Sequence, residues 1–205
     1  MKIVAVSQRV DIYPDRRNER RDALDQRLCL WLSDAGYLTV PVPNILCSLS
    51  SERHFLQKWL QRIEPNAVVL SGGNDIGDVI DRDDTERILL DYARQMGLPV
   101  LGICRGMQMM AISAGGQLVR VQDHVRTRHH LETIRPGWPG IVNSFHNLAL
   151  AGCPQGFEVT AKSEDGVIEA IRHKSLDWEG WMWHPERESE FQSEDIQRLK
   201  ALFGK

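Results

Sequence analysis

Residues 98–108 read Leu-Pro-Val-Leu-Gly-Ile-Cys-Arg-Gly-Met-Gln, an apolar run that continues through Gly-x-Cys-x-Gly into a stretch with helical spacing. A short apolar run of this kind is typical of a strand covered on both faces of a parallel sheet. Gly102 and Gly106 are small enough for a sharp turn between strand and helix, which would present Cys104 at its tip. The positive end of the helix would favour the thiolate. We therefore predict that Cys104 is a nucleophile, although a lone cysteine is more often a buried strand-end thiol.

The alternation of strand and helix extends in both directions from this stretch. Apolar runs predict strands at residues 2–7, 38–42, 67–70 and 100–103. Helical spacing predicts helices at residues 20–35, 52–62, 85–96 and 106–114. Shorter strand-like pieces follow at residues 117–121, 140–143, 157–161, 167–172 and 180–183, before a last amphipathic helix at residues 193–203. Residues 122–139 are rich in His, Arg and Pro and are predicted to form a long loop at the carboxyl edge of the sheet. The pattern predicts one α/β domain, residues 1–205.

The composition favours small-molecule chemistry. The formal net charge is -3 and the charges of both signs are mixed along the chain, so no nucleic-acid partner is expected. No apolar run approaches the roughly 20 residues of a membrane helix. The amino terminus does not resemble a signal peptide, and the cysteines are too far apart for a Cys-x-x-Cys pair. We therefore expect a cytoplasmic protein with free thiols, and no particular oligomeric state is implied. The cysteines are Cys29, Cys47, Cys104 and Cys153.

A histidine and a glutamate at the end of another predicted strand provide partners for the cysteine. Residues 180–188 read Gly-Trp-Met-Trp-His-Pro-Glu-Arg-Glu. The apolar strand would deliver His184 at its end, and Pro185 would stop the strand and stiffen the step to Glu186. A solvated turn is the ordinary alternative for such a sequence. Combined with Cys104, the pattern predicts that His184 is the general base and that Glu186 orients it.

Paired glycines after a third strand predict donors for an oxyanion. Residues 68–75 read Val-Val-Leu-Ser-Gly-Gly-Asn-Asp. Paired glycines usually mark only a tight turn. Their position one strand-helix unit before Cys104 favours a functional interpretation, in which the backbone N–H groups of Gly73 and Arg105 would face the oxyanion.

Three motifs resemble the signatures of class I glutamine amidotransferases: Gly-Ile-Cys-Arg-Gly-Met-Gln at 102–108, Ser-Gly-Gly-Asn-Asp at 71–75 and Trp-His-Pro-Glu at 183–186. Asn-Ser-Phe-His-Asn at 143–147 resembles a motif of the stand-alone γ-glutamyl hydrolases. γ-Glutamyl-γ-aminobutyrate hydrolases tend to carry His-His-Gln where this chain has His-Asn-Leu at 146–148. This departure and the compact length make the chain more similar to the γ-glutamyl-CDP-amidate hydrolases, which act in making capsule phosphoramidate groups. The motifs that carry this resemblance include Ser-Gln-Arg at 7–9, Glu-Arg-Arg-Asp at 19–22, Ile-Glu-Ala at 168–170 and Met-Trp-His-Pro-Glu-Arg-Glu at 182–188.

The resemblance implies a flavodoxin-like three-layer sandwich, with a central mostly parallel sheet and helices on both faces. It also implies hydrolysis of a γ-glutamyl amide with no metal and no organic cofactor. By analogy, the glutamyl pocket would be lined by Gln108, Asn143, Ser144, Phe145 and His146. The polar members also have ordinary interpretations: a helix surface residue, turn formers and a loop histidine.

The leaving group is the second part of the substrate prediction. Five arginines lie near the end of the first strand, and guanidinium groups bind phosphate bidentately. Most of them are balanced by nearby acids and are expected to be solvated. Arg9 lies nearest the strand end and is the preferred contact to a substrate that is a nucleotide conjugate. The arginines are Arg9, Arg16, Arg17, Arg20 and Arg21.

Three other functions stay open on the sequence. One is hydrolysis of γ-glutamyl-γ-aminobutyrate in polyamine catabolism. Another is a glutaminase subunit that supplies ammonia to a partner synthase. The third is an inactive binding module on the same fold, against which the complete Cys-His-Glu set argues. Activity of the isolated chain on glutamine and on several γ-glutamyl amides would distinguish them.

Overall fold

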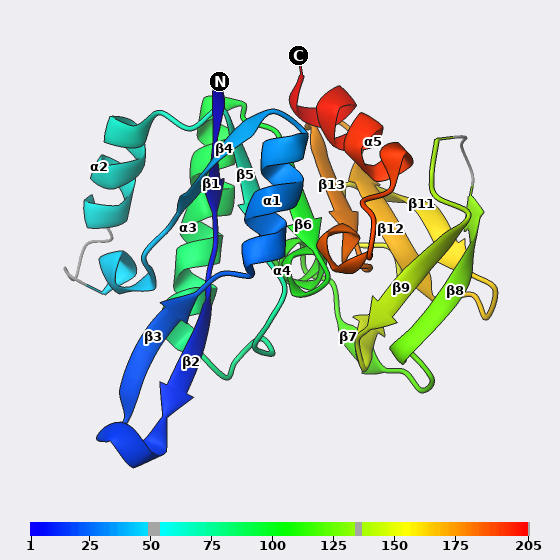
Figure 1. Cartoon of the computed structure of the whole chain (residues 1–205), viewed down its shortest axis with the longest axis horizontal. Helices are drawn as coiled ribbons and strands as arrows, with labels where there is room; N and C mark the ends of the chain where they lie inside the picture. Colours follow the sequence, from blue (N-terminus) through cyan, green and yellow to red (C-terminus); the bar gives the residue numbers. More distant parts are fainter. Residues whose placement is uncertain (49–53, 134–136, 205) are drawn as a thin grey trace.

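A nine-stranded sheet forms the centre of the molecule (Figure 1). The computed structural model describes residues 1–48, 54–133 and 137–204. In the sheet order β4-β1-β5-β6-β13-β12-β11-β8-β9, the first five strands are parallel and the remaining pairings are antiparallel. The parallel strands are β4 (Tyr37–Pro41), β1 (Lys2–Val6), β5 (Ala67–Leu70), β6 (Val100–Ile103) and β13 (Trp178–Trp181). The antiparallel extension comprises β12 (Ile168–His173), β11 (Phe157–Ser163), β8 (Val125–Thr133) and β9 (Ile141–Phe145).

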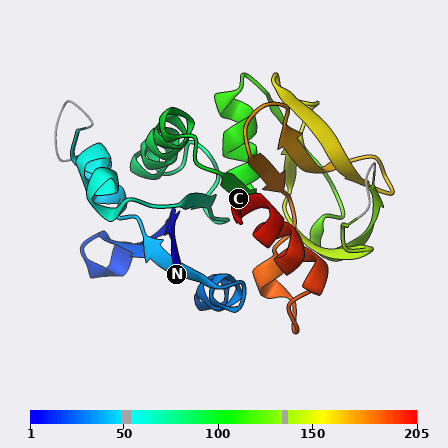
Figure 2. The same cartoon turned by 90° about the horizontal axis from the view of Figure 1, so that it is seen from above.

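Helices cover both faces of the parallel part of the sheet. Helices α1 (Gln26–Asp34) and α5 (Ser193–Phe203) lie on one face, and α3 (Ile80–Met96) and α4 (Arg105–Ser113) lie on the other (Figure 2). Helix α2 (His54–Ile63) packs beside α3. The predicted flavodoxin-like α/β sandwich is therefore confirmed. Two smaller sheets pair β7 (Leu118–Arg120) with β10 (Leu148–Leu150) and β2 (Arg9–Tyr13) with β3 (Glu19–Ala23).

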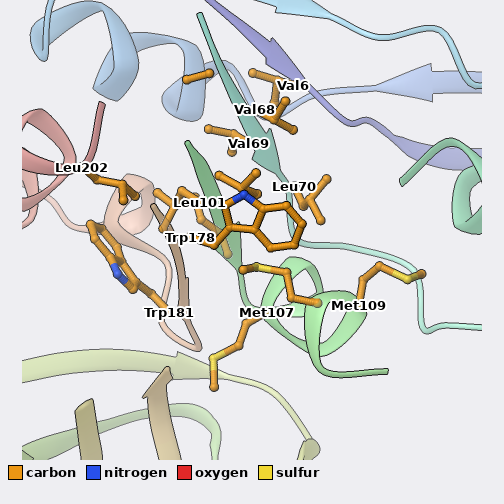
Figure 3. Packing of buried hydrophobic residues seen from close by; sticks show 14 of the residues in the cluster. Val6, Val68, Val69, Leu70, Leu101, Met107, Met109, Trp178, Trp181 and Leu202 are labelled. Carbon is orange, nitrogen blue, oxygen red and sulfur yellow. The ribbon is translucent and has the colours of Figure 1, made fainter. Parts of the chain in front are cut away.

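The apolar runs that predicted strands lie in the core because helices exclude water from both faces. Every residue of β5 and β6 is buried. Side chains of β1, β5 and β6 share one buried cluster with Met107 and Met109 of α4 and Leu202 of α5 (Figure 3). Full burial of one such aliphatic side chain contributes about 1.5–3 kcal/mol. The continuous apolar pattern of these strands therefore reflects burial on both faces.

The predicted helix at residues 20–35 was wrong in its first part. Residues Glu19–Ala23 form strand β3, which pairs antiparallel with β2 in a hairpin that projects from the carboxyl edge of the sheet (Figure 1). Helix α1 begins only at Gln26, because Asp25 caps it by accepting a hydrogen bond of 2.9 Å from the Arg27 N–H. Helix α3 begins at Ile80, five residues before the predicted start at residue 85.

The predicted loop at residues 122–139 was also wrong. Residues Val125–Thr133 form β8, which pairs with β9 on one side and β11 on the other. Within β8 only His129 is buried, so the strand lacks the apolar alternation that reveals a strand in sequence. Its order comes from backbone pairing on both sides. Residues 134–136 of the predicted loop lie outside the described residues.

Candidate active site

Cys104 lies at the turn between strand β6 and helix α4. Its φ of 50° and ψ of -105° put a residue with a side chain into a sparsely populated region of backbone conformation. The Cys104 N–H donates to the Trp181 carbonyl at 2.7 Å, which joins the turn to the end of β13. A Cβ on Gly102 would lie 2.6 Å from the Gly106 carbonyl carbon, so the turn can close only with small residues beside the cysteine. The structure thus has the elbow that the sequence predicted.

His184 follows strand β13 and is held by its backbone and by its ring. Asn143 on β9 accepts from the His184 N–H at 3.0 Å and donates its amide N–H to the His184 carbonyl at 2.7 Å. The His184 ring Nδ1 lies 2.7 Å from Oε1 of Glu186. Both ring and carboxylate are buried. Glu186 is therefore placed to fix the orientation of the imidazole, with Nε2 left for proton transfer.

The charge on His184 is set by its two neighbours. Burial lowers the pKa of His184, but the charges of Glu186 and Cys104 and hydrogen bonds to both side chains outweigh burial and raise the pKa to about 9. The imidazole is therefore protonated at neutral pH. The positive charge of the imidazolium therefore lies next to the Cys104 side chain.

The glycine pair after β5 lies directly against the histidine. A Cβ on Gly72 would lie 2.6 Å from His184 Cε1, so only glycine permits this approach. Gly73 has a φ of 121° and would bring a Cβ to 2.7 Å from both Arg82 Nη1 and Arg9 Cβ. Arg105 begins helix α4, so its N–H has no acceptor within the helix. The structure therefore places both predicted oxyanion donors on segments that adjoin the site.

A buried charge network supports the glycine loop, and sequence analysis gave its members Arg82 and Glu86 no role in the site. The Arg82 guanidinium donates to the Ser71 and Gly72 carbonyls at 2.8 and 2.9 Å. Glu86 pairs with Arg82 at 3.3 Å and also contacts the Arg105 guanidinium, whose Nε donates to the Asn74 carbonyl at 2.8 Å. Two charged residues four positions apart on an otherwise buried helix face were the available signal.

The predicted pocket residues divide into two groups. Gln108 donates to the Leu148 carbonyl at 2.9 Å, Ser144 donates to the His124 carbonyl at 2.7 Å, and Asn143 holds the His184 backbone. His146 Nδ1 lies 3.2 Å from the Leu148 carbonyl. Each of these four residues therefore has a polar group bound to protein atoms, and contact of the four with a glutamyl group stays a prediction.

Phe145 and Arg9 lie next to the site. The Phe145 ring meets the His184 ring edge to face, with centroids 5.9 Å apart. Arg9 is half exposed, pairs with Asp11 at 3.0 Å and lines a surface hollow together with Gly72, Gly73 and Glu186. Two other arginines of the β2–β3 hairpin are paired with acids: Arg20 with Asp81 at 2.6 Å and Arg21 with Glu19 at 2.6 Å. Of the five arginines near the end of the first strand, Arg9, the predicted phosphate contact, is the one that lines this hollow.

The fold is an α/β sandwich with a cysteine, a histidine and a glutamate gathered at the carboxyl edge of its sheet. The family described as glutamine amidotransferase class-I matches residues 38–202, and the chain belongs to this family. It is 34% identical over 144 residues to the γ-glutamyl-CDP-amidate hydrolase of Campylobacter jejuni, a match that covers 67% of this chain and 70% of that protein. Family membership supports hydrolysis of a glutamine amide as the general activity.

Other relatives are components of synthases. The chain is 40% identical over 103 residues to anthranilate synthase component 2 of Archaeoglobus fulgidus, covering 47% of this chain and 57% of that protein. A crystal structure described as a GMP synthase subunit from Thermoplasma acidophilum superposes with a TM-score of 0.73 at 23% identity, covering 100% of this chain and 93% of that one. This structural likeness shows the fold.

Two further expectations from the sequence concern membrane helices and the state of the cysteines. Within the described residues, no helix has the length and apolar character needed to cross a membrane. All four cysteines are free thiols, as predicted. Cys104 and Cys47 are buried, and Cys153 is exposed.

We predict that His184 titrates with a pKa of about 9 in an NMR titration, and at lower pH in Cys104→Ala, which removes a negative charge and a hydrogen bond. The folded pKa lies above the ordinary value of 6.5, so the extra stability is complete below pH 6.5 and is lost as the pH rises through about 9. The free energy of unfolding should fall less steeply over this window in Cys104→Ala than in Cys153→Ala, the control. An unchanged His184 pKa in Cys104→Ala would show that the two side chains are not coupled.

Proposed function

We propose that this protein hydrolyses a γ-glutamyl amide through a thioester on Cys104. The observation that carries the proposal is the buried chain of contacts from Glu186 through His184 to Cys104, at a turn where Cys104 has a positive φ. A protonated histidine beside a cysteine provides both the nucleophile and the acid that amide cleavage requires.

The reaction has two halves. The Cys104 sulfur attacks the γ-carbonyl carbon, and the carbonyl oxygen takes up negative charge that faces the N–H groups of Gly73 and Arg105. His184 gives its proton to the amide nitrogen as the carbon–nitrogen bond breaks, which leaves a thioester and releases the amine or amidate. His184 then takes a proton from water, whose oxygen attacks the thioester. Cleavage of the carbon–sulfur bond releases glutamate and restores the thiolate.

We predict that His184→Ala and Cys104→Ala each abolish hydrolysis, because they remove the proton donor and the nucleophile. Glu186→Gln should retain more activity, since this side chain orients the imidazole and takes no proton itself. Steady-state rates on γ-glutamyl p-nitroanilide, with far-UV circular dichroism to check folding, provide the measurement. Near-normal turnover by Cys104→Ala would reject the proposal.

For the substrate we propose γ-glutamyl-CDP-amidate, which would be split into glutamate and cytidine diphosphoramidate for capsule phosphoramidate synthesis. The similarity to the Campylobacter jejuni enzyme supports this choice. A second support is the place of Arg9, whose side-chain stem packs against Gly73 and which lines the hollow together with Gly72, Gly73 and Glu186. A diphosphate in the leaving group would find a bidentate donor there.

We predict that γ-glutamyl-CDP-amidate is cleaved with a higher kcat/KM than γ-glutamyl-γ-aminobutyrate or glutamine. Arg9→Ala should lose about 2 kcal/mol on the nucleotide substrate, or roughly 30-fold in kcat/KM, and should barely affect the γ-glutamyl anilide. Arg16→Ala is the matched control, because Arg16 packs over the Tyr13 ring at the far end of the same hairpin. Equal or better turnover of γ-glutamyl-γ-aminobutyrate would reject the nucleotide substrate, while the amide hydrolase function would survive.

A glutaminase subunit is the second candidate function. It is favoured by the similarity to anthranilate synthase component 2 and to a glutamine-hydrolysing GMP synthase subunit of Methanocaldococcus jannaschii, the latter 28% identical over 157 residues. A protein of this kind would hydrolyse glutamine fully only in the presence of a partner synthase. The substrate comparison above discriminates between the two, since a stand-alone hydrolase is active as an isolated chain.

A further inference from the structure

Three buried metal-binding side chains from separate segments meet in the antiparallel part of the molecule. His124 directly precedes strand β8, His146 directly follows β9, and Glu169 lies on β12. Their side chains are at most 1% exposed. The His146 N–H donates to the His124 carbonyl at 2.9 Å, so the two histidine segments are joined through their backbones.

In each histidine, the ring nitrogen that points away from Glu169 lies next to an oxygen that can only accept a hydrogen bond, so this nitrogen carries the proton. His146 Nδ1 lies 3.2 Å from the Leu148 carbonyl, which can only accept, so Nδ1 carries the proton. His124 Nε2 lies 2.9 Å from Asp165, a carboxylate that accepts in the same way. In a neutral ring the lone pair is then on the other nitrogen. Metal-binding histidines characteristically donate their second N–H to a carboxylate or a backbone carbonyl.

The inward nitrogens of both histidines face the buried carboxylate of Glu169. His124 Nδ1 lies 3.5 Å and His146 Nε2 lies 3.4 Å from Oε1 of Glu169. Neither nitrogen has a hydrogen-bond partner among the described residues, and both Glu169 oxygens also lack one. If both rings are neutral, a lone pair of each histidine faces the buried Glu169 carboxylate. This arrangement is costly, so a positive charge is needed between the three side chains.

The spacing fits a metal ion better than two added protons. One ligand atom from each of the three residues lies within 4.8 Å of the others. Zinc bonds of about 2.0–2.1 Å in tetrahedral geometry would place neighbouring ligand atoms roughly 3.3–3.5 Å apart, which matches the two histidine–glutamate distances of 3.5 and 3.4 Å. The widest pair in the set is 4.8 Å apart, so these ligand atoms must draw together when the ion binds. Two imidazolium rings would repel one another, because the His124 and His146 centroids are only 4.8 Å apart and His129 lies 4.1 Å from His124. One divalent cation leaves the rings neutral.

We propose that His124, His146 and Glu169 bind one divalent transition-metal ion, for which zinc is the best match. Two imidazoles and a carboxylate are ligands that suit zinc, and the second Glu169 oxygen or a water would complete the shell. The role is structural. The Glu169 carbonyl accepts from the Met182 N–H at 2.8 Å, two residues before His184, and His146 is adjacent to Phe145, which packs on the His184 ring. The ion would therefore stiffen the segments that hold the catalytic histidine.

The test measures zinc binding by the full chain without a histidine tag. Cys104→Ser serves as the parent, because Cys104 and His184 could themselves bind zinc. After removal of metal and dialysis against zinc chloride, mass spectrometry of the metal should find about one zinc per chain, and zinc should raise the Tm. In this background, Glu169→Gln and His124→Gln should each bind zinc at least ~10-fold more weakly than the parent. Asp165→Asn should bind zinc ~10-fold more weakly, because it changes the hydrogen bond that orients the His124 ring. His130→Gln, which changes an exposed histidine of β8, should bind like the parent.

Cobalt(II) gives a readout that folding defects do not imitate. The parent loaded with cobalt should show the visible absorption of a tetrahedral site, and His130→Gln should show the same band. The proposal is overturned if the parent binds no zinc after dialysis, or if Glu169→Gln and His124→Gln, folded by circular dichroism, bind as tightly as the parent. Absence of zinc binding together with a protonated His124 or His146 by NMR would mean that protons neutralise Glu169.

Discussion

The close approach of helix α4 to strand β5 at Gly106 is the constraint on which the site depends. A Cβ at Gly106 would lie 2.1 Å from the Leu70 carbonyl oxygen, so the helix can begin here only with glycine. Because β5 ends at Leu70, this contact brings the first turn of α4 beside the Gly72 and Gly73 loop. The nucleophile, the helix N-terminus and the glycine N–H groups are thereby collected around one point.

Buried polar side chains on either side of the contact between α4 and β5 position the other residues of the site. On the parallel side, Arg82 and Glu86 tie the carbonyls of the glycine loop to helix α3. On the antiparallel side, Asn143 clamps the backbone of His184 and also donates to Glu188 at 2.8 Å. Cys104 and His184 follow neighbouring strands, β6 and β13. The segments beside them are fixed by polar contacts from opposite halves of the sheet. Rigid positioning of this kind is what amide cleavage requires, since the barrier depends on placement of the reacting groups.

The elements that could be predicted from the sequence are those that are buried on both faces or that need glycine for a sharp turn. Strands β5 and β6 are buried on both faces, so their apolar runs gave their bounds directly, and the glycines around Cys104 revealed the elbow. Strand β8 was missed because backbone pairing rather than apolar burial orders it. The partner of a buried polar side chain is a long-range choice that local pattern does not encode. This explains why the hold of Asn143 on the His184 backbone and the cluster around Glu169 were not predicted.

Hydrolysis as proposed passes through a covalent step at Cys104, and trapping the thioester tests it most directly. The chain would be mixed with γ-glutamyl p-nitroanilide, quenched in acid within the first turnovers, digested and analysed by mass spectrometry. We predict a γ-glutamyl group on the peptide that contains Cys104 and on none of the peptides with the other three cysteines. An active chain that shows no acylated peptide, or acylation of another cysteine, would contradict this mechanism.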